Sequence, residues 1–136
     1  FVGIQFIPAN LNQSNIVPKE DIIDFHKPPD RITSILKISC YDCHSNNTNY
    51  PWYNKLQPIS WLLEKHIDDA KEELNFSEFK TYSKRKQKSK LKSIVSQIED
   101  NEMPIKGYVL MHKNAKLFEK DKTILINWIE KLKDSL

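Results

Sequence analysis

The sequence predicts an all-α fold, in which a bundle of about four helices follows an extended N-terminal lead. Charged residues make up 29% of the 136 positions and recur with helical spacing between apolar residues. Only 2 residues are glycine, and a chain of this length suits one compact domain with a modest core. No run of ~20 apolar residues, the length that crosses a membrane, occurs in the sequence.

The first 28 residues are predicted to form the lead. They are mostly polar, contain several prolines and lack periodicity, with one helical turn expected near residues 20–25. The beginning, Phe1 to Pro8, is apolar and is interpreted as the end of a membrane anchor or signal segment. The alternative is a short arm that packs on the domain. Residues 29–136 are predicted to form the helical domain.

Four helices are predicted within this domain from apolar residues three and four positions apart. Asp30 and Ser83 are expected to cap the first and third helices. Pro104 ends the third, because a residue before proline is pushed out of helical geometry. The predicted helices span about residues 30–39, 58–74, 83–100 and 119–133. The apolar stripes expected on the first, third and fourth helices comprise Ile32, Ile35 and Leu36; Leu91, Ile94, Val95 and Ile98; and Ile124, Leu125, Trp128, Ile129 and Leu132. The face of the second helix that is expected to be buried comprises Ile59, Leu62, Leu63, His66, Ile67, Ala70 and Leu74.

The strongest functional signal is Cys40-Tyr41-Asp42-Cys43-His44, a C-x-x-C-H motif of the kind that attaches haem covalently. Two thiols three positions apart on a turn can each add to a haem vinyl group, and the next imidazole can then bind the iron. We therefore predict one haem c per chain, held by Cys40 and Cys43, with His44 as the proximal iron ligand.

Cys40 and Cys43 are the only cysteines, so neither a disulfide framework nor a tetrahedral zinc site is indicated. A thiol–disulfide redox pair is the alternative to haem attachment. Such pairs lie between a strand and a helix in a βαβ unit, whereas no strands are predicted here. That alternative also leaves His44 unexplained.

The sixth iron ligand is predicted to be Met103. It precedes Pro104, which stiffens the loop after the third helix and can hold a thioether at fixed reach. Methionine opposite histidine is also the usual pairing in electron-carrying cytochromes c and raises the reduction potential. The alternatives are His66 on the predicted apolar face, Met111, His112, or an open position.

Aromatic residues crowd the segment after the motif. Trp52, Tyr53 and Trp61 are predicted to contribute flat walls and hydrogen-bond donors to a haem-binding site, together with an inward-facing His66. Ordinary core packing is the alternative for these side chains, and the two interpretations are compatible.

The charge of the chain does not indicate a nucleic-acid binder. The formal net charge is +3, and the two ionised propionates of a haem would offset most of it. The most basic stretch, residues 84–92, has two interpretations. It is either a solvated face paired with acidic residues of the second helix, or a docking surface for an acidic redox partner.

Several further segments accompany the motif: Thr48–Tyr53, Pro58–Trp61, His66, Leu74–Ser77, Glu102–Pro104, Tyr108, His112, Ala115–Leu117 and Trp128. With these, the chain resembles a family of small bacterial haem-binding domains over most of residues 30–135. One departure is Phe118, where a serine-like helix cap would be more usual.

The resemblance implies a cytochrome c-like monohaem domain on the periplasmic side, anchored to the inner membrane through an N-terminal segment. Its expected partners are redox proteins, and its expected function is outer-sphere electron transfer rather than catalysis, because no paired carboxylates or nucleophile with a base are evident. The alternatives are a haem-based gas sensor or ligand-binding module, and a peroxidase-type enzyme with His66 or His112 over an open iron.

Overall fold

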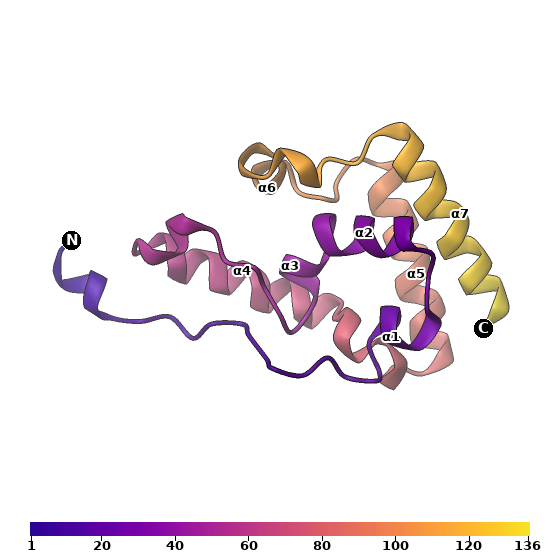
Figure 1. Cartoon of the computed structure of the whole chain (residues 1–136), viewed down its shortest axis with the longest axis horizontal. Helices are drawn as coiled ribbons and strands as arrows, with labels where there is room; N and C mark the ends of the chain where they lie inside the picture. Colours follow the sequence, from indigo (N-terminus) through magenta and orange to yellow (C-terminus); the bar gives the residue numbers. More distant parts are fainter.

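The computed structural model describes all 136 residues and consists of helices joined by loops, without strands (Figure 1). The predicted all-α class is therefore confirmed. None of the helices is both long enough and apolar enough to cross a membrane. The α-helices are α1 (Ile22–His26), α2 (Asp30–Ser39), α3 (Tyr41–His44), α4 (Ile59–Glu73), α5 (Lys84–Glu99), α6 (Lys106–Met111) and α7 (Glu119–Ser135). The short 3-10 helices are η1 (Gly3–Phe6), η2 (Trp52–Lys55), η3 (Phe76–Thr81) and η4 (Lys113–Ala115).

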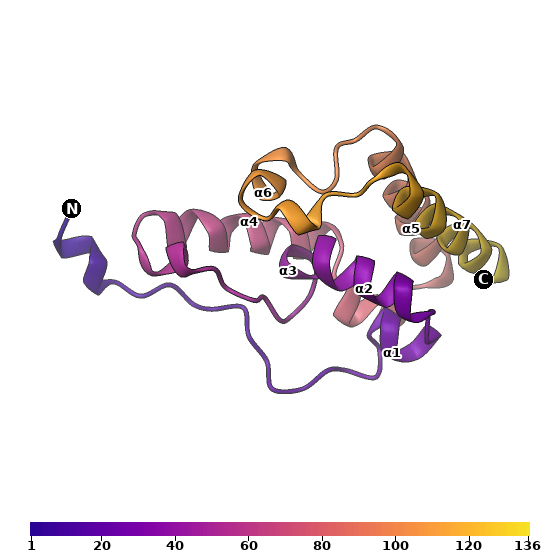
Figure 2. The ribbon, with the colours of Figure 1, turned by 45° about the horizontal axis from the view of Figure 1, so that its top comes forward.

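The main core lies where α2, α5 and α7 meet, and α5 and α7 run side by side in both ribbon views (Figures 1 and 2). The apolar stripes predicted for these helices face this core, so their predicted positions are confirmed. The Ser83 side chain accepts a hydrogen bond from the Lys86 backbone N–H at 3.2 Å, as an N-cap does. The cap predicted at Asp30 is wrong, because Asp30 is the first residue of α2 and Pro29 occupies the N-cap position without a side-chain bond. Buried members of the core include Ile32, Ile35, Leu36, Leu91, Val95, Ile98, Leu125, Ile129 and Leu132.

The predicted buried face of α4 is partly wrong. Ile67 and Leu74 are buried, but Ile59, Leu62 and His66 are exposed. Ser60 and Glu64 are buried in their place. The first turns of α4 pack on η2 and on the polar loop before it, away from α5 and α7 (Figure 1). The prediction of a helix was therefore correct, but the prediction of its buried face was not. The buried side of its first turns packs on a polar loop, and the apolar residues do not indicate that side.

The N-terminal lead runs along the molecule and is fixed to the loop after the haem motif by Asn12. The Asn12 N–H donates to the Tyr50 hydroxyl at 2.5 Å, and its carbonyl accepts the Thr48 N–H at 3.0 Å. Its side-chain amide donates to the Ser45 carbonyl at 2.7 Å and accepts from the Lys71 ammonium at 2.7 Å. The Ser14 N–H also donates to the Asn47 side-chain oxygen, at 2.7 Å, so the lead holds the segment that follows His44 from outside.

Candidate haem site

The motif forms a single helical turn directly after α2. The N–H groups of Cys43 and His44 both donate to the Cys40 carbonyl, at 3.2 and 3.0 Å. Residues four apart on a turn share a face, and the Cys40 and His44 side chains indeed line one pocket. Cys43 instead lines a smaller neighbouring hollow with Tyr53 and Tyr108.

The His44 ring is oriented by the C-terminal end of α4. Its Nδ1 lies 2.9 Å from the Leu74 carbonyl oxygen and 3.1 Å from that of Ala70. Carbonyl oxygens only accept hydrogen bonds, so Nδ1 carries the proton and Nε2 keeps a free lone pair. Burial lowers the pKa of His44, although the two carbonyls act in the opposite direction. The site therefore holds a neutral imidazole with one nitrogen available to a metal.

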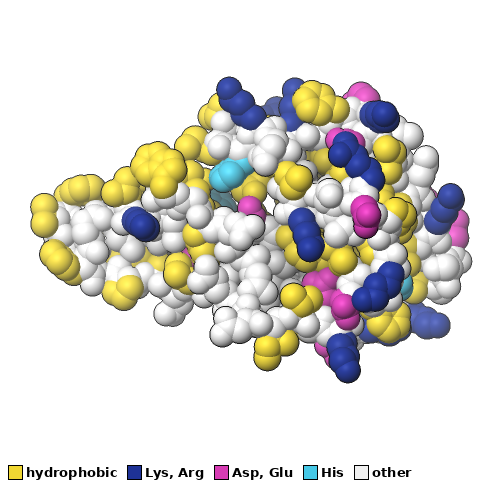
Figure 3. Space-filling view, in the orientation of Figure 1, with side chains coloured by type: hydrophobic (Ala, Val, Ile, Leu, Met, Phe, Trp, Pro, Cys, Tyr) yellow, Lys and Arg dark blue, Asp and Glu magenta, His cyan; other side chains and the backbone are white.

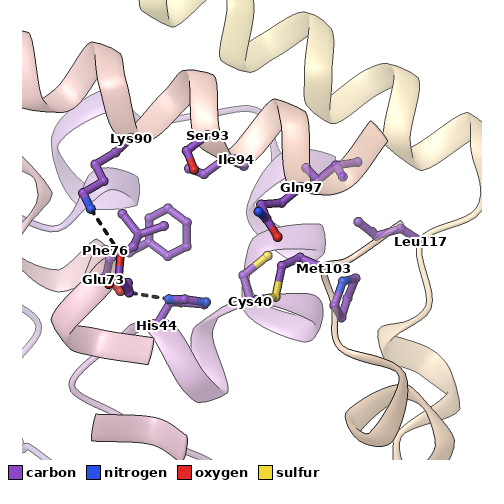
Figure 4. Close-up of a pocket in the computed structure, with 13 residues that line it drawn as sticks. Cys40, His44, Glu73, Phe76, Lys90, Ser93, Ile94, Gln97, Met103 and Leu117 are labelled. Atoms are coloured by element: carbon purple, nitrogen blue, oxygen red, sulfur yellow. Dashed lines mark hydrogen bonds and ion pairs between the residues drawn. The ribbon is translucent and has the colours of Figure 1, made fainter. Parts of the chain in front are cut away.

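The pocket has a volume of about 230 Å³ and lies between α3, the end of α4, α5 and the loop that contains Met103 (Figure 4). Its apolar walls include Phe76, Ile94 and Leu117. The volume is below the ~300–1,000 Å³ typical of ligand pockets, and Met103 is 38% exposed.

Met103 and His44 reach the pocket from opposite sides, with the Cys40 sulfur between them (Figure 4). The Met103 N–H donates to the Gln97 carbonyl at 3.3 Å, which ties the start of the loop to α5. The structure thus brings together three of the residues that the sequence singled out. One imidazole nitrogen, one thiol and one thioether face an apolar pocket, and this donor set fits a haem.

The protonation state of the two thiols distinguishes between the two interpretations of the motif, haem attachment and disulfide exchange. Burial, with a smaller contribution from Cys43, raises the pKa of Cys40 to about 12. Burial, with a smaller contribution from Asp42, raises the pKa of Cys43 to about 11. Exchange-active cysteine pairs have lowered pKa values, because the thiolate is the nucleophile. Both thiols here are protonated at neutral pH, which disfavours the thiol–disulfide alternative.

The two residues between the cysteines brace the motif in opposite directions. The Tyr41 hydroxyl donates to the Asp21 carboxylate at 2.7 Å and so connects the motif to the lead. The Asp42 carboxylate accepts the Tyr108 hydroxyl at 2.5 Å and the Asn49 N–H at 3.0 Å. Sequence reasoning assigned no role to these contacts. Tyr41 and Asp42 occupy the variable positions of the motif, and no spacing rule connects them to partners so distant in the chain.

The other predicted site residues lie outside this pocket. Trp52 is 74% exposed, Trp61 is half-buried, and Tyr53 lies beside Cys43. The inward orientation predicted for His66 is wrong, because this residue lies on the outer face of α4 and is exposed. Contact of these four residues with a haem stays a prediction.

The alternatives to Met103 are placed less favourably. Met111 is 56% exposed and does not line the pocket. His112 stacks on Tyr108, with ring centroids 4.3 Å apart, and its Nδ1 lies 3.2 Å from the Tyr108 carbonyl oxygen. His112 therefore belongs to the neighbouring hollow, and neither residue lines the pocket that contains His44.

An apolar pocket that presents a neutral imidazole and a thioether is the kind of site that a haem-binding protein provides. The chain belongs to the haem-binding domain family, whose sequence profile matches residues 1–131. No curated protein and no solved structure matches the chain.

Proposed function

We propose that this chain is a monohaem c-type cytochrome that transfers electrons by an outer-sphere route. The observation that supports it most is the fixed ring of His44, which has Nδ1 bound to the Leu74 carbonyl and Nε2 free at the pocket. A carbonyl behind a ligating histidine sets its tautomer and raises its basicity. Membership of the haem-binding domain family gives the cofactor independently.

In this proposal Cys40 and Cys43 hold the haem covalently, His44 is the proximal ligand and Met103 is the distal ligand. When bound, the haem supplies one-electron chemistry, between ferric and ferrous iron. The protein contributes a fixed imidazole and apolar walls that exclude water from the pocket, of which Phe76 is the most buried aromatic member. Exclusion of water and a thioether ligand both raise the reduction potential.

The rim of the pocket offers donors for charged groups of the cofactor. The Lys90 ammonium lies 3.9 Å from the Glu73 carboxylate, and both residues line the pocket together with Gln97 (Figure 4). Lys90 and Gln97 are the residues that would donate to a haem propionate. This role is part of the proposal.

The proposed location is the periplasm, with the protein tethered to the inner membrane and with redox proteins as partners. This location suits covalent haem attachment and the apolar beginning of the lead, where Phe1 and Phe6 are 83% and 82% exposed. The N-terminus lies at the narrow end of the molecule (Figure 1), where hydrophobic side chains gather on the surface beside polar atoms and few charged side chains (Figure 3).

A ligand-binding module is the second candidate, and the exposure of Met103 is the observation that favours it. Because this loop is exposed, a small ligand such as carbon monoxide could replace the Met103 thioether at the iron. In that case the reduced protein would bind carbon monoxide rapidly.

The optical spectrum of the haem-loaded protein tests both candidates. An electron carrier with Met103 bound gives low-spin iron and a weak far-red sulfur-to-iron band, and Met103→Ala abolishes this band. Met111→Ala is the matched control, because Met111 is also exposed but lies outside the pocket, and it should leave the band unchanged. High-spin iron in the unmodified chain, or a band that survives Met103→Ala, would refute the assignment.

A further inference from the structure

Helix α5 carries an exposed basic face near its N-terminal end. No acidic residue occurs between residues 79 and 98. The exposed cations of this face, which we call the α5 basic face, are Lys84, Arg85, Lys86, Lys88 and Lys92. Lys90 lies among them in the sequence, but it is half-buried at the rim of the pocket.

These cations lack carboxylate partners. The only ion pair of the stretch joins Lys90 to Glu73, at 3.9 Å, and it does not involve the exposed face. Lys86 lies 4.2 Å from the centre of the Tyr82 ring, a cation–π contact that leaves its net charge in place. The sequence interpretation of a face paired with the acidic α4 is therefore wrong, apart from Lys90.

The position of these charges lowers the stability of helix α5. The first turn of α5 carries Lys84, Arg85 and Lys86 at the positive end of the helix dipole, where acidic residues are favourable. In addition, Lys84, Lys88 and Lys92 follow one another four residues apart, and like charges at this spacing repel. Helix α7 has the opposite arrangement, with Glu119 and Asp121 in its first turn.

The α5 basic face lies on a helix that lines the candidate haem pocket, although none of its five cations lines the pocket itself. The same helix forms one wall of that pocket through Lys90, Ser93, Ile94 and Gln97 (Figure 4). Lys and Arg side chains are numerous on the broad end of the molecule that contains α5, and sparse on the narrow end (Figure 3). A protein docked on the α5 basic face would therefore have only helix α5 between itself and the pocket.

We propose that the α5 basic face is the docking surface for an acidic redox partner protein. Opposite charges on two redox proteins accelerate their encounter and orient their centres. One electron passes from the reduced partner to the ferric haem, or from the ferrous haem to the oxidised partner, and no bond forms or breaks. This inference rests on the proposed electron-transfer function and adds the chemistry of the partner and its place of docking.

The test compares two triple variants with the same change in net charge. The first, Lys84→Gln/Lys86→Gln/Lys88→Gln, neutralises the α5 basic face. The control, Lys113→Gln/Lys120→Gln/Lys131→Gln, neutralises exposed lysines outside α5 that also form no ion pair. Hexacyanoferrate(III) serves as the anionic electron acceptor, and hexacyanochromate(III) as a paramagnetic anion that broadens nearby amide signals.

In the haem-loaded protein we expect the first variant to slow oxidation of the ferrous haem by hexacyanoferrate(III) about three- to tenfold at low ionic strength. The control should change the rate less than about twofold, and high salt should remove the difference. Hexacyanochromate(III) should broaden amide signals of α5 in the unmodified chain and not in the first variant. The melting temperature of the first variant should equal or exceed that of the unmodified protein, because unfavourable charges have been removed.

Equal slowing by both variants would overturn the proposal, since net charge alone would explain it. A lower melting temperature of the first variant with unchanged rates would also overturn it, because the cations would then serve the fold. Binding to phosphatidylglycerol vesicles that is lost only in the first variant would assign the surface to a membrane instead. The broadening of amide signals by hexacyanochromate(III) can be measured without haem. A failure of haem attachment would therefore refute the proposed function, while the binding of the anion to α5 could still be tested.

Discussion

Tyr108→Phe removes the hydrogen bond that connects the Met103 loop to the haem motif. The loop is held at its start by the Gln97 carbonyl, which accepts the Met103 N–H at 3.3 Å. Beyond it, α6 contains no buried residue and is tied to the motif by the Tyr108 hydroxyl, 2.5 Å from the Asp42 carboxylate. Because no residue of α6 is buried, we expect this bond to contribute strongly to holding α6 and the loop before it against the motif.

The expected magnitude follows from the type of hydrogen bond. A bond to a charged group contributes about 1.5–3 kcal/mol to stability. Asp42 keeps its bond from the Asn49 N–H after the substitution, and Tyr108 is only half-buried, so we take a value at or just below the low end of this range, about 1–2 kcal/mol. That amount favours the open loop by about five- to thirtyfold.

Imidazole binding to the ferric haem-loaded protein measures this opening, because imidazole takes the sixth position only when Met103 leaves it. Tyr108→Phe should therefore tighten imidazole binding about five- to thirtyfold and weaken the sulfur-to-iron band. Tyr53→Phe is the control, since Tyr53 lines the same hollow beside Cys43 without a hydrogen bond to Asp42. An unchanged imidazole affinity in Tyr108→Phe, or an equal gain in Tyr53→Phe, would refute the reasoning.

Three further substitutions test the packing and the polar contacts. Leu91→Ala should lower the free energy of unfolding by about 2–5 kcal/mol in urea titrations, because Leu91 is fully buried in the core; a loss below about 1 kcal/mol would contradict this. Asn12→Ala removes the side-chain bonds to Ser45, Thr48 and Lys71 and should loosen the attachment of the lead, which hydrogen exchange would detect as faster exchange at the Thr48 amide, the donor to the Asn12 carbonyl; an unchanged rate would show that the Asn12 side chain does not hold the loop. Glu64→Gln should raise the melting temperature at pH 7, because burial raises the pKa of Glu64 above its usual value of 4.5 and one carboxylate oxygen is unpaired. The gain should shrink as the pH falls through the raised pKa and vanish below the usual value of 4.5, where the carboxyl is neutral in both the folded and the unfolded state; a gain that persists at pH 3 would have another cause.

The sequence predicted the long helices well because their signals are local. Leu91 and Leu125 lie on the apolar stripes that the spacing marked, and Ser83 caps α5 as predicted. Such patterns depend on residues within one or two turns of each other. The face of α4 was predicted less well because it depends on a neighbour distant in the chain. Glu64 is buried on the side that carries Tyr50, and nothing in the helical period indicates that loop.

The same distinction applies to the candidate site. The motif identified Cys40 and His44 from spacing alone, and Met103 followed from its place before a proline. The carbonyl behind His44 belongs to Leu74, thirty residues away, and only the fold brings the two together. The Asp42–Tyr108 bond spans sixty-six residues and is equally invisible to local patterns.

The mass of the denatured protein, purified from a host whose envelope attaches haem to such motifs, tests the central claim most directly. If Cys40 and Cys43 both form thioether links, the intact chain carries the mass of one haem after denaturation, and Cys40→Ala/Cys43→Ala loses it. A chain that leaves that host with the mass of the bare polypeptide would contradict covalent attachment, whatever haem it bound reversibly.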